Sequence, residues 1–327
     1  MLTRLTLRQL EYCLAAAEFG SISEAAERIH VSASSISSAI THVESELSVA
    51  LFVRHHAQGL SITPVGHEVL RQIRQLLDQA LALYEVADDA QGAVRGPLRV
   101  GCFTTLAALV APELCQGFAR AHPGVQVTQI EDHQEGLIER LRQAQIDVAI
   151  TYDLNVVQPD ICFEALASLP PHVIVSETDP LAYRRVTTLK ELAAHPMVLL
   201  DLPLSRDYFL SLFQEAGVTP LISARSHSPD VVRSLVANGV GYSLANVRPR
   251  SSHSLDGKKL VNVHLRGQPR PMQMGLAWAR AQKPRHVVEA FMHRCRSFIS
   301  NEYIPGMTPP GRGARMSDED DAPAGSA

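Results

Sequence analysis

The first 63 residues carry hydrophobic positions at helical spacing and predict three short helices. Between Leu7 and Ala17 these positions follow one another at intervals of three or four residues, which predicts the buried face of a first helix, ended by Gly20. Ser21 and Ser32 are predicted to begin the second and third helices, because serine is a favoured N-cap residue. The buried stripe of the third helix is expected at Ile36, Ile40, Val43 and Leu47.

The segment from residue 51 to residue 90 predicts a hairpin followed by a long helix. Two short extended stretches flank Gly59, which indicates the hairpin. From residue 66 onward, hydrophobic positions alternate at intervals of four and three residues, and this pattern is typical of a helix that pairs with another helix. An ordinary amphipathic helix packed on its own domain remains the alternative. The positions of the repeat are Val69, Ile73, Leu76, Ala80, Leu83 and Ala87.

Beyond a Gly/Pro linker at residues 91–97, stretches typical of strands alternate with stretches typical of helices. Such alternation predicts parallel sheets with helices on both faces. The length of this part, roughly 200 residues, suits two small α/β units better than one. The last segment, 305–327, contains Pro, Gly, Ser and an acidic run without a hydrophobic period, and we expect it to be disordered.

Composition and charge narrow the class of protein. The chain of 327 residues has a net charge of −4, which argues mildly against a nucleic-acid binder. Its five cysteines are scattered without a CxxC pair, so the sequence indicates no disulfide framework, no zinc site and a reducing, cytoplasmic compartment. There is no stretch of 18 apolar residues and no secretory h-region, so we expect neither a membrane span nor export. No cofactor is indicated either.

The second and third predicted helices, joined by a tight turn, form a helix-turn-helix pattern. In such motifs the second helix, here Ser32–Leu47, enters the major groove of DNA. Four segments sharpen this interpretation: "LRQLEYCLAAAEFGSISEAAERIHVS", "SSAITHVESEL", "LFVR" and "LSITPVG". On these residues the sequence resembles LysR-type transcriptional regulators, and the resemblance extends from residue 3 to about residue 300.

The resemblance implies an α/β protein with a winged helix-turn-helix head, a long linker helix and an effector domain of two Rossmann-like subdomains, built like type 2 periplasmic binding proteins. The chain would cross between the subdomains twice, near Phe163–Ser168 and Arg266–Pro271. The expected bounds are 1–65 for the head, 66–92 for the dimerisation helix and 97–300 for the effector domain, with 97–165 and 269–300 in subdomain 1 and 166–268 in subdomain 2.

The resemblance also implies partners. We expect double-stranded DNA at a promoter or operator, a small-molecule effector, and a homodimer through helix 66–90 that assembles into a tetramer, with RNA polymerase as a further candidate. Motifs of the GxSxG, GxxxxGK[ST], HExxH and complete GxGxxG types are absent, so we expect no enzyme. Two alternatives stay open: a solute-binding module without DNA function, and a redox-responsive regulator that uses Cys102.

The expected DNA-binding surface is poor in positive charge. Residues 1–63 contain four arginines and six glutamates, a formal net charge of −2, which predicts weak non-specific binding and reliance on a second head. Family members often carry Gln-Pro early in the recognition helix and Arg at the position of Ser38, and this chain departs from both. Serine hydroxyls can still donate to and accept from phosphates and base edges. The candidate DNA-binding residues are Ser32, Ser34, Ser35, Ser37, Ser38, Arg54, His55 and His56.

The expected effector site lies where three predicted strands lead into helices. In open α/β sheets, ligands bind beyond the carboxyl ends of strands, and helix N-termini there favour anions. The strand ends lead to Thr104, Ser205 and Ser226, which predicts a small organic anion, most simply a carboxylate, with Arg206 as a bidentate partner. The same hydroxyl residues would cap helices without any ligand. The candidate effector-binding residues are Thr104, Thr105, Ser205, Arg206, Ser226, His227, Gln129 and Thr151.

Overall fold

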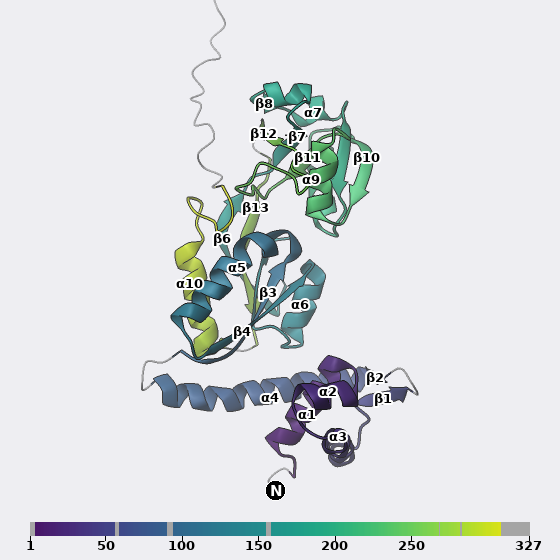
Figure 1. Ribbon diagram of the computed structural model, residues 1–327, viewed down its shortest axis with the longest axis vertical. Helices are drawn as coiled ribbons and strands as arrows, with labels where there is room; N and C mark the ends of the chain where they lie inside the picture. The colour runs from purple at the N-terminus through teal and green to yellow at the C-terminus, as the bar shows by residue number, and fades with distance from the viewer. Residues whose placement is uncertain are drawn as a thin grey trace, which may run out of the picture.

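The computed structural model of the chain describes residues 4–55, 59–89, 94–154, 158–267, 269–281 and 283–308. A head of three helices and a small hairpin lies at one end, a long helix runs beside it, and two α/β lobes follow along the same axis (Figure 1). Among the described residues, no helix is long and apolar enough to cross a membrane.

The head forms the helices that the sequence predicts, and local side chains begin two of them. The hydroxyl groups of Ser21 and Ser32 accept the backbone N–H groups of Glu24 and Ser35, as expected of N-cap residues. The elements of the head are α1 (Leu7–Phe19), α2 (Ile22–Arg28), α3 (Ala33–Leu47) and the antiparallel hairpin of β1 (Phe52–His55) and β2 (Gly59–Ile62).

The hydrophobic stripe of α3 anchors this helix in the core of the head. Ile36, Ile40 and Val43 are buried there, as predicted. Leu47 was predicted to continue the stripe, but this prediction is wrong, because its side chain is 40% exposed. Leu47 is the last residue of α3 and lies outside the core cluster of the head.

The β1–β2 hairpin is held close to the helices by a glutamate and two glycines. Glu44 Oε1 on α3 accepts the backbone N–H groups of Leu51 (2.7 Å) and Phe52 (3.1 Å) at the start of β1. A Cβ atom on Gly59 would lie 2.4 Å from the carbonyl oxygen of Gly20, so only glycine permits this close approach. The negative charge of Glu44 is therefore used inside the head.

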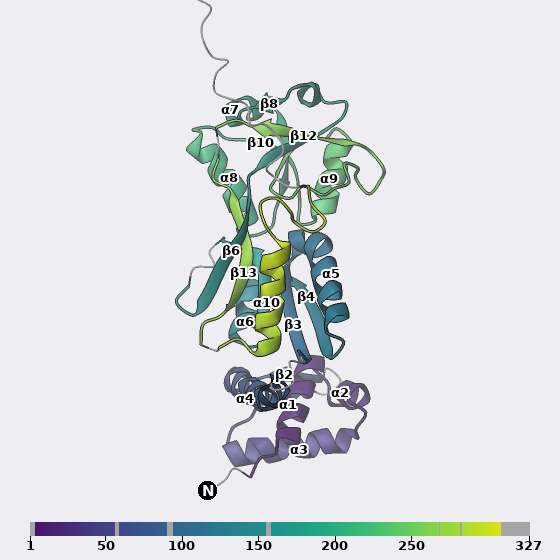
Figure 2. The same ribbon diagram turned by 90° about the vertical axis from the view of Figure 1, so that its left-hand side faces the viewer.

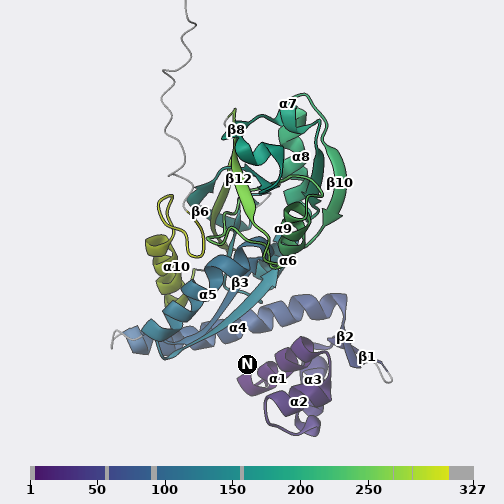
Figure 3. The same ribbon diagram turned by 45° about the horizontal axis from the view of Figure 1, so that its top comes forward.

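Helix α4 (Pro64–Asp89) lies between the head and the lobes (Figure 3). Its first half belongs to the head, because Leu70 and Ile73 are buried in the head's core. Farther along, the side chains of Leu76 and Leu83 are 47% and 74% exposed. The predicted repeat is therefore divided between packing against the chain's own head and an apolar surface that the described residues leave exposed. Ala87 belongs to the part of α4 whose side chains lie outside the described residues.

Lobe 1 surrounds a five-stranded sheet of order β4-β3-β5-β13-β6. Strands β3, β4 and β5 are parallel, whereas β13 runs antiparallel to both β5 and β6. Its elements are β3 (Gly96–Phe103), α5 (Thr104–Ala121), β4 (Val125–Asp132), α6 (Gln134–Arg142), β5 (Val148–Tyr152), β6 (Ile161–Leu169), β13 (Met272–Ala279) and α10 (His286–Phe298).

Lobe 2 contains a four-stranded sheet of order β11-β7-β12-β8 and a parallel pair, β10-β9. Strands β11 and β12 are both antiparallel to β7. Its elements are β7 (His172–Ser176), a 3-10 helix η1 (Pro180–Tyr183), β8 (Val186–Thr187), α7 (Leu189–Leu192), β9 (Pro196–Leu200), α8 (Ser205–Glu215), β10 (Leu221–Ser226), α9 (Pro229–Ala237), β11 (Ser243–Ala245) and β12 (Leu260–Leu265).

The predicted parallel pairing is found for β3, β4 and β5 and for β9 and β10, but both lobes also contain antiparallel pairs, and the two crossover segments explain much of this difference. Strands β6 and β13 pair side by side and link the two lobes (Figure 2). The first carries the chain out of lobe 1 and the second brings it back, so they must run in opposite directions. The first predicted crossing, at Phe163–Ser168, lies within β6, and the second, at Arg266–Pro271, comes just before β13.

The segment after α10 packs against both lobes. Ile304 and Met307 are buried, and Met307 forms a β-bridge with Pro249 of lobe 2. On the other side, the Tyr303 hydroxyl donates to Glu113 Oε1 of α5 in lobe 1 at 2.6 Å. The expected disorder of 305–327 is therefore wrong for 305–308, while residues 309–327 lie outside the described part of the chain. Ile304 and Met307 are isolated apolar residues without a hydrophobic period, so the sequence alone did not indicate that this segment packs against the lobes.

Candidate DNA-binding surface and effector cavity

The serines at the start of α3 form a connected, exposed cluster. Ser32 Oγ accepts the Ser35 N–H group at 3.1 Å and lies 2.8 Å and 2.7 Å from the hydroxyl oxygens of Ser34 and Ser35. Ser38 is also exposed, one turn farther along the same helix. The buried residues Ile36, Ala39 and Ile40 occupy the opposite face. The serine side of α3 is thus free to approach a groove of DNA closely.

The hairpin contributes a positive charge beside α3. Arg54 on β1 reaches α3, where its Nη2 donates to Ser37 Oγ at 3.5 Å. Across the hairpin, His55 Nε2 lies 2.8 Å from Ser61 Oγ. The structure thus joins Arg54 to the recognition helix, whereas His56 lies outside the described residues.

A cavity of about 490 Å³ lies between the two lobes. Thr104 and Thr105, at the start of α5, line it from lobe 1, and Ser205 and His227 line it from lobe 2, so four of the candidate effector-binding residues face one cavity. Most of its remaining wall is apolar. The main apolar lining residues are Leu109, Ile174, Leu200, Phe209, Val232, Leu244 and Met272.

Four predicted effector residues do not line this cavity. Thr151 is fully buried, and its hydroxyl donates to Gln134 Oε1. Gln129 donates to Glu131 Oε1 at 3.3 Å. Ser226 Oγ accepts the Ser228 N–H group, which fixes the turn before α9. These three side chains support the walls of the cavity instead of facing it.

Arg206 is the most consequential of the four corrections. Its Nε donates to Asp207 Oδ1 at 2.9 Å and its Nη1 to Asp201 Oδ1 at 3.4 Å, so the guanidinium is held by two carboxylates outside the cavity. It is therefore not the bidentate partner of an anion that the sequence suggested. Asp201 and Asp207, which lie on either side of Arg206 in the sequence, could have indicated that its charge is used within the protein.

The three helix starts at the cavity differ in what they can offer a ligand. Ser228 Oγ caps α9 itself by accepting the Val231 N–H group. At α8, the N–H groups of Ser205 and Arg206 donate to nearby backbone carbonyls. At α5, the N-cap residue Phe103 makes no side-chain capping bond. The α5 start is therefore the best of the three for an anion.

Comparison with known proteins agrees with this architecture. Residues 7–67 match the bacterial regulatory helix-turn-helix protein family, lysR type, and residues 91–299 match the LysR substrate binding domain. The chain belongs to the LysR family of transcriptional regulators. A helix-turn-helix head with an effector-binding domain is the organisation that this family shares.

Relatives of this LysR-family regulator cover most of its length. The transcriptional dual regulator GltC of Bacillus subtilis is 30% identical over 73% of this chain and 79% of its own. The structure of HinK, a LysR family regulator from Pseudomonas aeruginosa, shares 34% identity with a TM-score of 0.61, covering 90% of this chain and 99% of HinK. Full-length CbnR bound to its target DNA has the same fold at 24% identity and a TM-score of 0.53, covering 90% and 99% of the two chains.

Several polar residues of the cavity were missed by the sequence analysis. Arg233 lies one turn into α9, and its Nη2 donates to the carbonyls of Ser251 and His253. Burial lowers its pKa below the usual range of arginine. Arg233 comes four residues after Pro229 and so lies on the same face of α9 as the residue that begins this helix. This spacing could have indicated that Arg233 reaches the cavity. The other polar lining residues outside the predicted set are Glu131, Tyr152, Ser228, Asp230 and Asn246.

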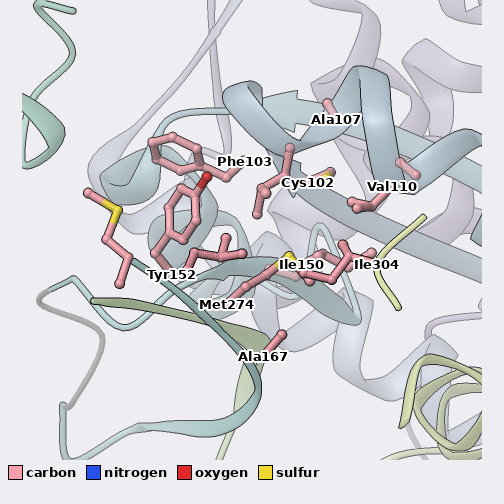
Figure 4. Close-up of a cluster of buried hydrophobic side chains, with 14 of the residues drawn as sticks. Cys102, Phe103, Ala107, Val110, Ile150, Tyr152, Ala167, Met274 and Ile304 are labelled. Carbon is pink, nitrogen blue, oxygen red and sulfur yellow. The ribbon is translucent and has the colours of Figure 1, made fainter. Parts of the chain in front are cut away.

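Cys102 of this regulator lies in the core of lobe 1 (Figure 4). Burial, reinforced by the nearby Cys115, raises the pKa of the Cys102 thiol well above its ordinary value. Burial likewise raises the pKa of Cys115 to about 11. Because the thiolate is the reactive form, buried thiols of this kind are inert. Nothing in the structure therefore favours the alternative of a redox-responsive regulator.

Helix α4 is fastened to lobe 1 by a mostly buried ion-pair network, which we call the α4 junction: Asp78, Arg99, Asp147 and Arg285. Arg99 Nη2 donates to both carboxylate oxygens of Asp78 at 2.9 Å and to Asp147 Oδ1 at 2.7 Å. Arg285 lies 3.3 Å from the other oxygen of Asp147. Arg99 belongs to β3, the strand whose far end reaches the cavity at Thr104. One strand thus joins the α4 junction to the effector cavity.

Proposed function

We propose that this LysR-family regulator binds a small organic anion between its lobes and that the anion changes how the head engages an operator. The cavity carries this proposal, because both lobes and the start of α5 line it. A ligand that contacts both lobes binds one arrangement of them better than another. It shifts the protein toward that arrangement by the difference in affinity.

A carboxylate is the anion best supported by the residues present. The start of α5, with Thr104 and Thr105, offers backbone N–H groups that no side chain caps. Arg233 adds a positive side chain to the opposite wall. Its Nη2 already donates to two carbonyls, and because a guanidinium carries five N–H donors, the others are left for an anion to accept.

For DNA binding we propose Ser34, Ser35 and Ser38 at the groove and Arg54 at the phosphate backbone, with His55 and His56 as further phosphate contacts. The exposed, small side chains at the start of α3 support close approach, and the Arg54–Ser37 contact supports a joint surface of helix and hairpin. Ser32 contributes by fixing this turn, because it caps α3.

A second copy of the chain would supply the affinity that one weakly charged head lacks. Leu76 and Leu83 lie seven residues apart on α4 and expose apolar surface. Such spacing fits a paired helix, so a homodimer through α4 is proposed, with two dimers forming a tetramer on DNA. RNA polymerase remains a further proposed partner.

The decisive experiment measures the affinity of the full-length protein for its own promoter region by fluorescence anisotropy at fixed salt. Replacing Ser35 and Ser38 together by alanine is expected to weaken binding about thirtyfold, since each hydrogen bond contributes about 1 kcal/mol and every 1.4 kcal/mol is about tenfold in affinity. Ser45→Ala, an exposed serine at the other end of α3, is the matched control and should change little. Unaltered affinity of the double variant would contradict the groove assignment.

Arg54→Ala tests the phosphate contact separately. Binding should weaken on every DNA sequence. The slope of the logarithm of affinity against the logarithm of salt concentration should decrease in magnitude by about one, because one fewer phosphate is neutralised. If this variant changed sequence preference but not the salt dependence, Arg54 would contact bases instead.

A further inference from the structure

We propose that a cleft between the head and lobe 1 is a separate anion site, which binds a phosphate group. The cleft has a volume of about 480 Å³. Helices α1 and α4 line it from the head, and β3, β4 and the end of α6 line it from lobe 1, which lies directly above the head in Figure 2. No described residue lines both this cleft and the cavity between the lobes, so the two sites are distinct.

Positive side chains outnumber negative ones in this cleft. Arg74 of α4, Arg99 of β3 and Arg140 of α6 line it, whereas Glu18 is the one acidic residue among the described lining residues. Carboxylates already pair with Arg99 and Arg140. Arg74 forms no ion pair with any described carboxylate, although Glu18 and others attract it. The described residues therefore leave the charge of Arg74 without a direct counterion.

Most hydrogen-bond donors of Arg74 also have no acceptor. Its Nη1 donates to the Gln143 carbonyl at 2.8 Å, which is its one hydrogen bond to the described residues. A guanidinium carries five N–H donors, so the others are left over. Burial, reinforced by repulsion from Arg99, lowers the pKa of Arg74 below the usual range of arginine. An anion beside Arg74 would accept the remaining donors and offset the repulsion.

The two other arginines each keep one nitrogen free. Arg99 uses Nε and Nη2 for its carboxylate partners, and Arg140 uses Nε for Asp132 and Nη1 for Gln145. Arg99 Nη1 and Arg140 Nη2 thus have no partner among the described residues. These nitrogens and those of Arg74 keep accessible surface, because the polar atoms of the described side chains that are both buried and unpaired all lie elsewhere. A ligand in the cleft can therefore reach them.

Two glutamines of the cleft connect Arg74 to Arg140. Gln143 accepts Arg74 through its carbonyl, and its Oε1 accepts Gln145 Nε2 at 2.8 Å. Gln145 Oε1 in turn accepts Arg140 Nη1 at 3.0 Å. The arginines are thus held close together by a short chain of hydrogen-bonded residues. Guanidinium groups from three different elements suit a phosphate, with its several acceptor oxygens and greater charge, better than a carboxylate with two oxygens.

A phosphate in this cleft would act on the head and not on the lobes. Arg74 lies one helical turn before Asp78 of the α4 junction, and Leu70, one turn earlier still, belongs to the core of the head. An anion held by Arg74 and Arg140 would add a contact between this unit and lobe 1. It would stabilise their present arrangement, because a ligand favours the arrangement that binds it best. The regulator would then respond to a second ligand at a place that the effector does not touch.

The test measures binding of inorganic phosphate to the full-length protein without DNA, by calorimetry at constant ionic strength. Acetate is the monovalent comparison, and glycerol 3-phosphate shows whether the free ion or a phosphate ester is preferred. Phosphate or its ester is expected to bind at least about tenfold more tightly than acetate, because it offers more charge and more acceptors. If neither binds more tightly than acetate, the site is not a phosphate site and the proposal is overturned.

Two variants of α4 locate the site. Arg74→Gln should weaken phosphate binding at least about tenfold, because a charge-assisted hydrogen bond is lost. Arg71→Gln removes the same charge three residues earlier, where Arg71 pairs with Glu68 outside the cleft, and should change the affinity by less than about twofold. Unchanged affinity in Arg74→Gln would mean that Arg74 only binds the end of α6, and equal losses in both variants would indicate attraction by overall charge. Either result contradicts the assignment.

Amide hydrogen exchange on the unmodified protein gives an answer even if Arg74→Gln does not fold. Saturating phosphate should slow exchange in α1 and in the segment 140–145, and leave the start of α5 at 104–109 unchanged. Protection at the start of α5 alone would place the anion in the cavity between the lobes and overturn the proposal.

Discussion

The α4 junction allows a prediction in which two members of one ion-pair network behave very differently. Burial raises the pKa of Asp78 above its ordinary value, although Arg99 opposes this shift. For Arg99, burial alone would lower the pKa, but Asp147 and Asp78 together raise it above its usual range. The desolvation of Asp78, together with repulsion from Asp147, therefore outweighs its attraction to Arg99, whereas the charge of Arg99 is stabilised by its two carboxylates.

The cost of a substitution at the α4 junction depends on whether the remaining buried charges still have partners. Arg99→Met removes the hydrogen-bonded partner of Asp78, which keeps only the weaker attraction of Arg285, and leaves Asp147 with Arg285. Breaking a buried ion pair in this way costs about 3–5 kcal/mol. Asp78→Asn keeps the shape and an acceptor for Arg99, which still pairs with Asp147. This change should alter the free energy of unfolding by less than about 1 kcal/mol.

The assay is urea unfolding of the full-length protein, with the free energy of unfolding obtained by linear extrapolation. Trp278 is the only tryptophan of the sequence, and it lines the same small cleft as Asp78, Asp147 and Arg285. Its fluorescence should therefore report the loss of this part of lobe 1. Equal costs for the two variants would refute the argument that desolvation of Asp78 offsets its ion pair.

Two further predictions concern lobe 2 and the segment after α10. Burial, reinforced by nearby Arg248, lowers the pKa of His172 to about 3 from its ordinary 6.5. Between these two pH values the unfolded chain binds a proton at His172 and the folded protein does not. The contribution of the neutral His172 to the free energy of unfolding is therefore complete above pH 6.5 and is lost as the pH falls. Relative to His172→Gln, the wild-type protein should lose about 2 kcal/mol of unfolding free energy between pH 7 and pH 5, and a constant difference would argue against a neutral buried imidazole. Gly306→Ala should cost more unfolding free energy than Gly217→Ala, because both have φ near +70° but only at Gly306 would the new Cβ lie 2.5 Å from the Leu109 carbonyl oxygen. Equal costs would mean that the segment does not pack closely on α5.

The parts of the fold that depend on neighbouring residues could be predicted from the sequence. Ser21 and Ser32 begin helices because their hydroxyls accept N–H groups three residues ahead, and this spacing is visible in the chain. The β1–β2 hairpin and the buried stripe of α3 are local in the same sense. Leu47 shows the limit, since periodicity does not say where the covering helices end.

The cavity could be predicted only in part, because its polar chemistry depends on contacts between distant residues. Thr104 and Thr105 were found from a strand that leads into a helix. Arg206 was predicted to bind the anion, but its guanidinium donates instead to the carboxylates of Asp201 and Asp207. Asn246 could not have been found, because the contacts of its amide nitrogen with Leu169 and Tyr208 join residues that lie far apart in the sequence.

The arrangement of contacts also limits how an effector can act. Leu70 and Ile73 bury the first half of α4 in the core of the head, and Asp78 fastens the same helix to Arg99 of lobe 1. The head, α4 and lobe 1 are therefore joined by side chains that an effector in the cavity does not touch. Lobe 2 is connected to this unit through β6, β13 and the segment at 304–308.

From this we infer which part of the chain moves when the lobes close. Arg99 and Phe103 are four residues apart on β3, roughly 13 Å, and Thr104 follows Phe103 directly at the cavity, so one strand ties the α4 junction to the cavity wall. Closure would then turn lobe 2 against a unit that already includes its own head, so the spacing of two heads on DNA can change only through contacts of lobe 2 with another chain. A regulator built in this way needs its assembled form to respond to the effector, and a monomeric variant should bind the effector without any change in its affinity for DNA.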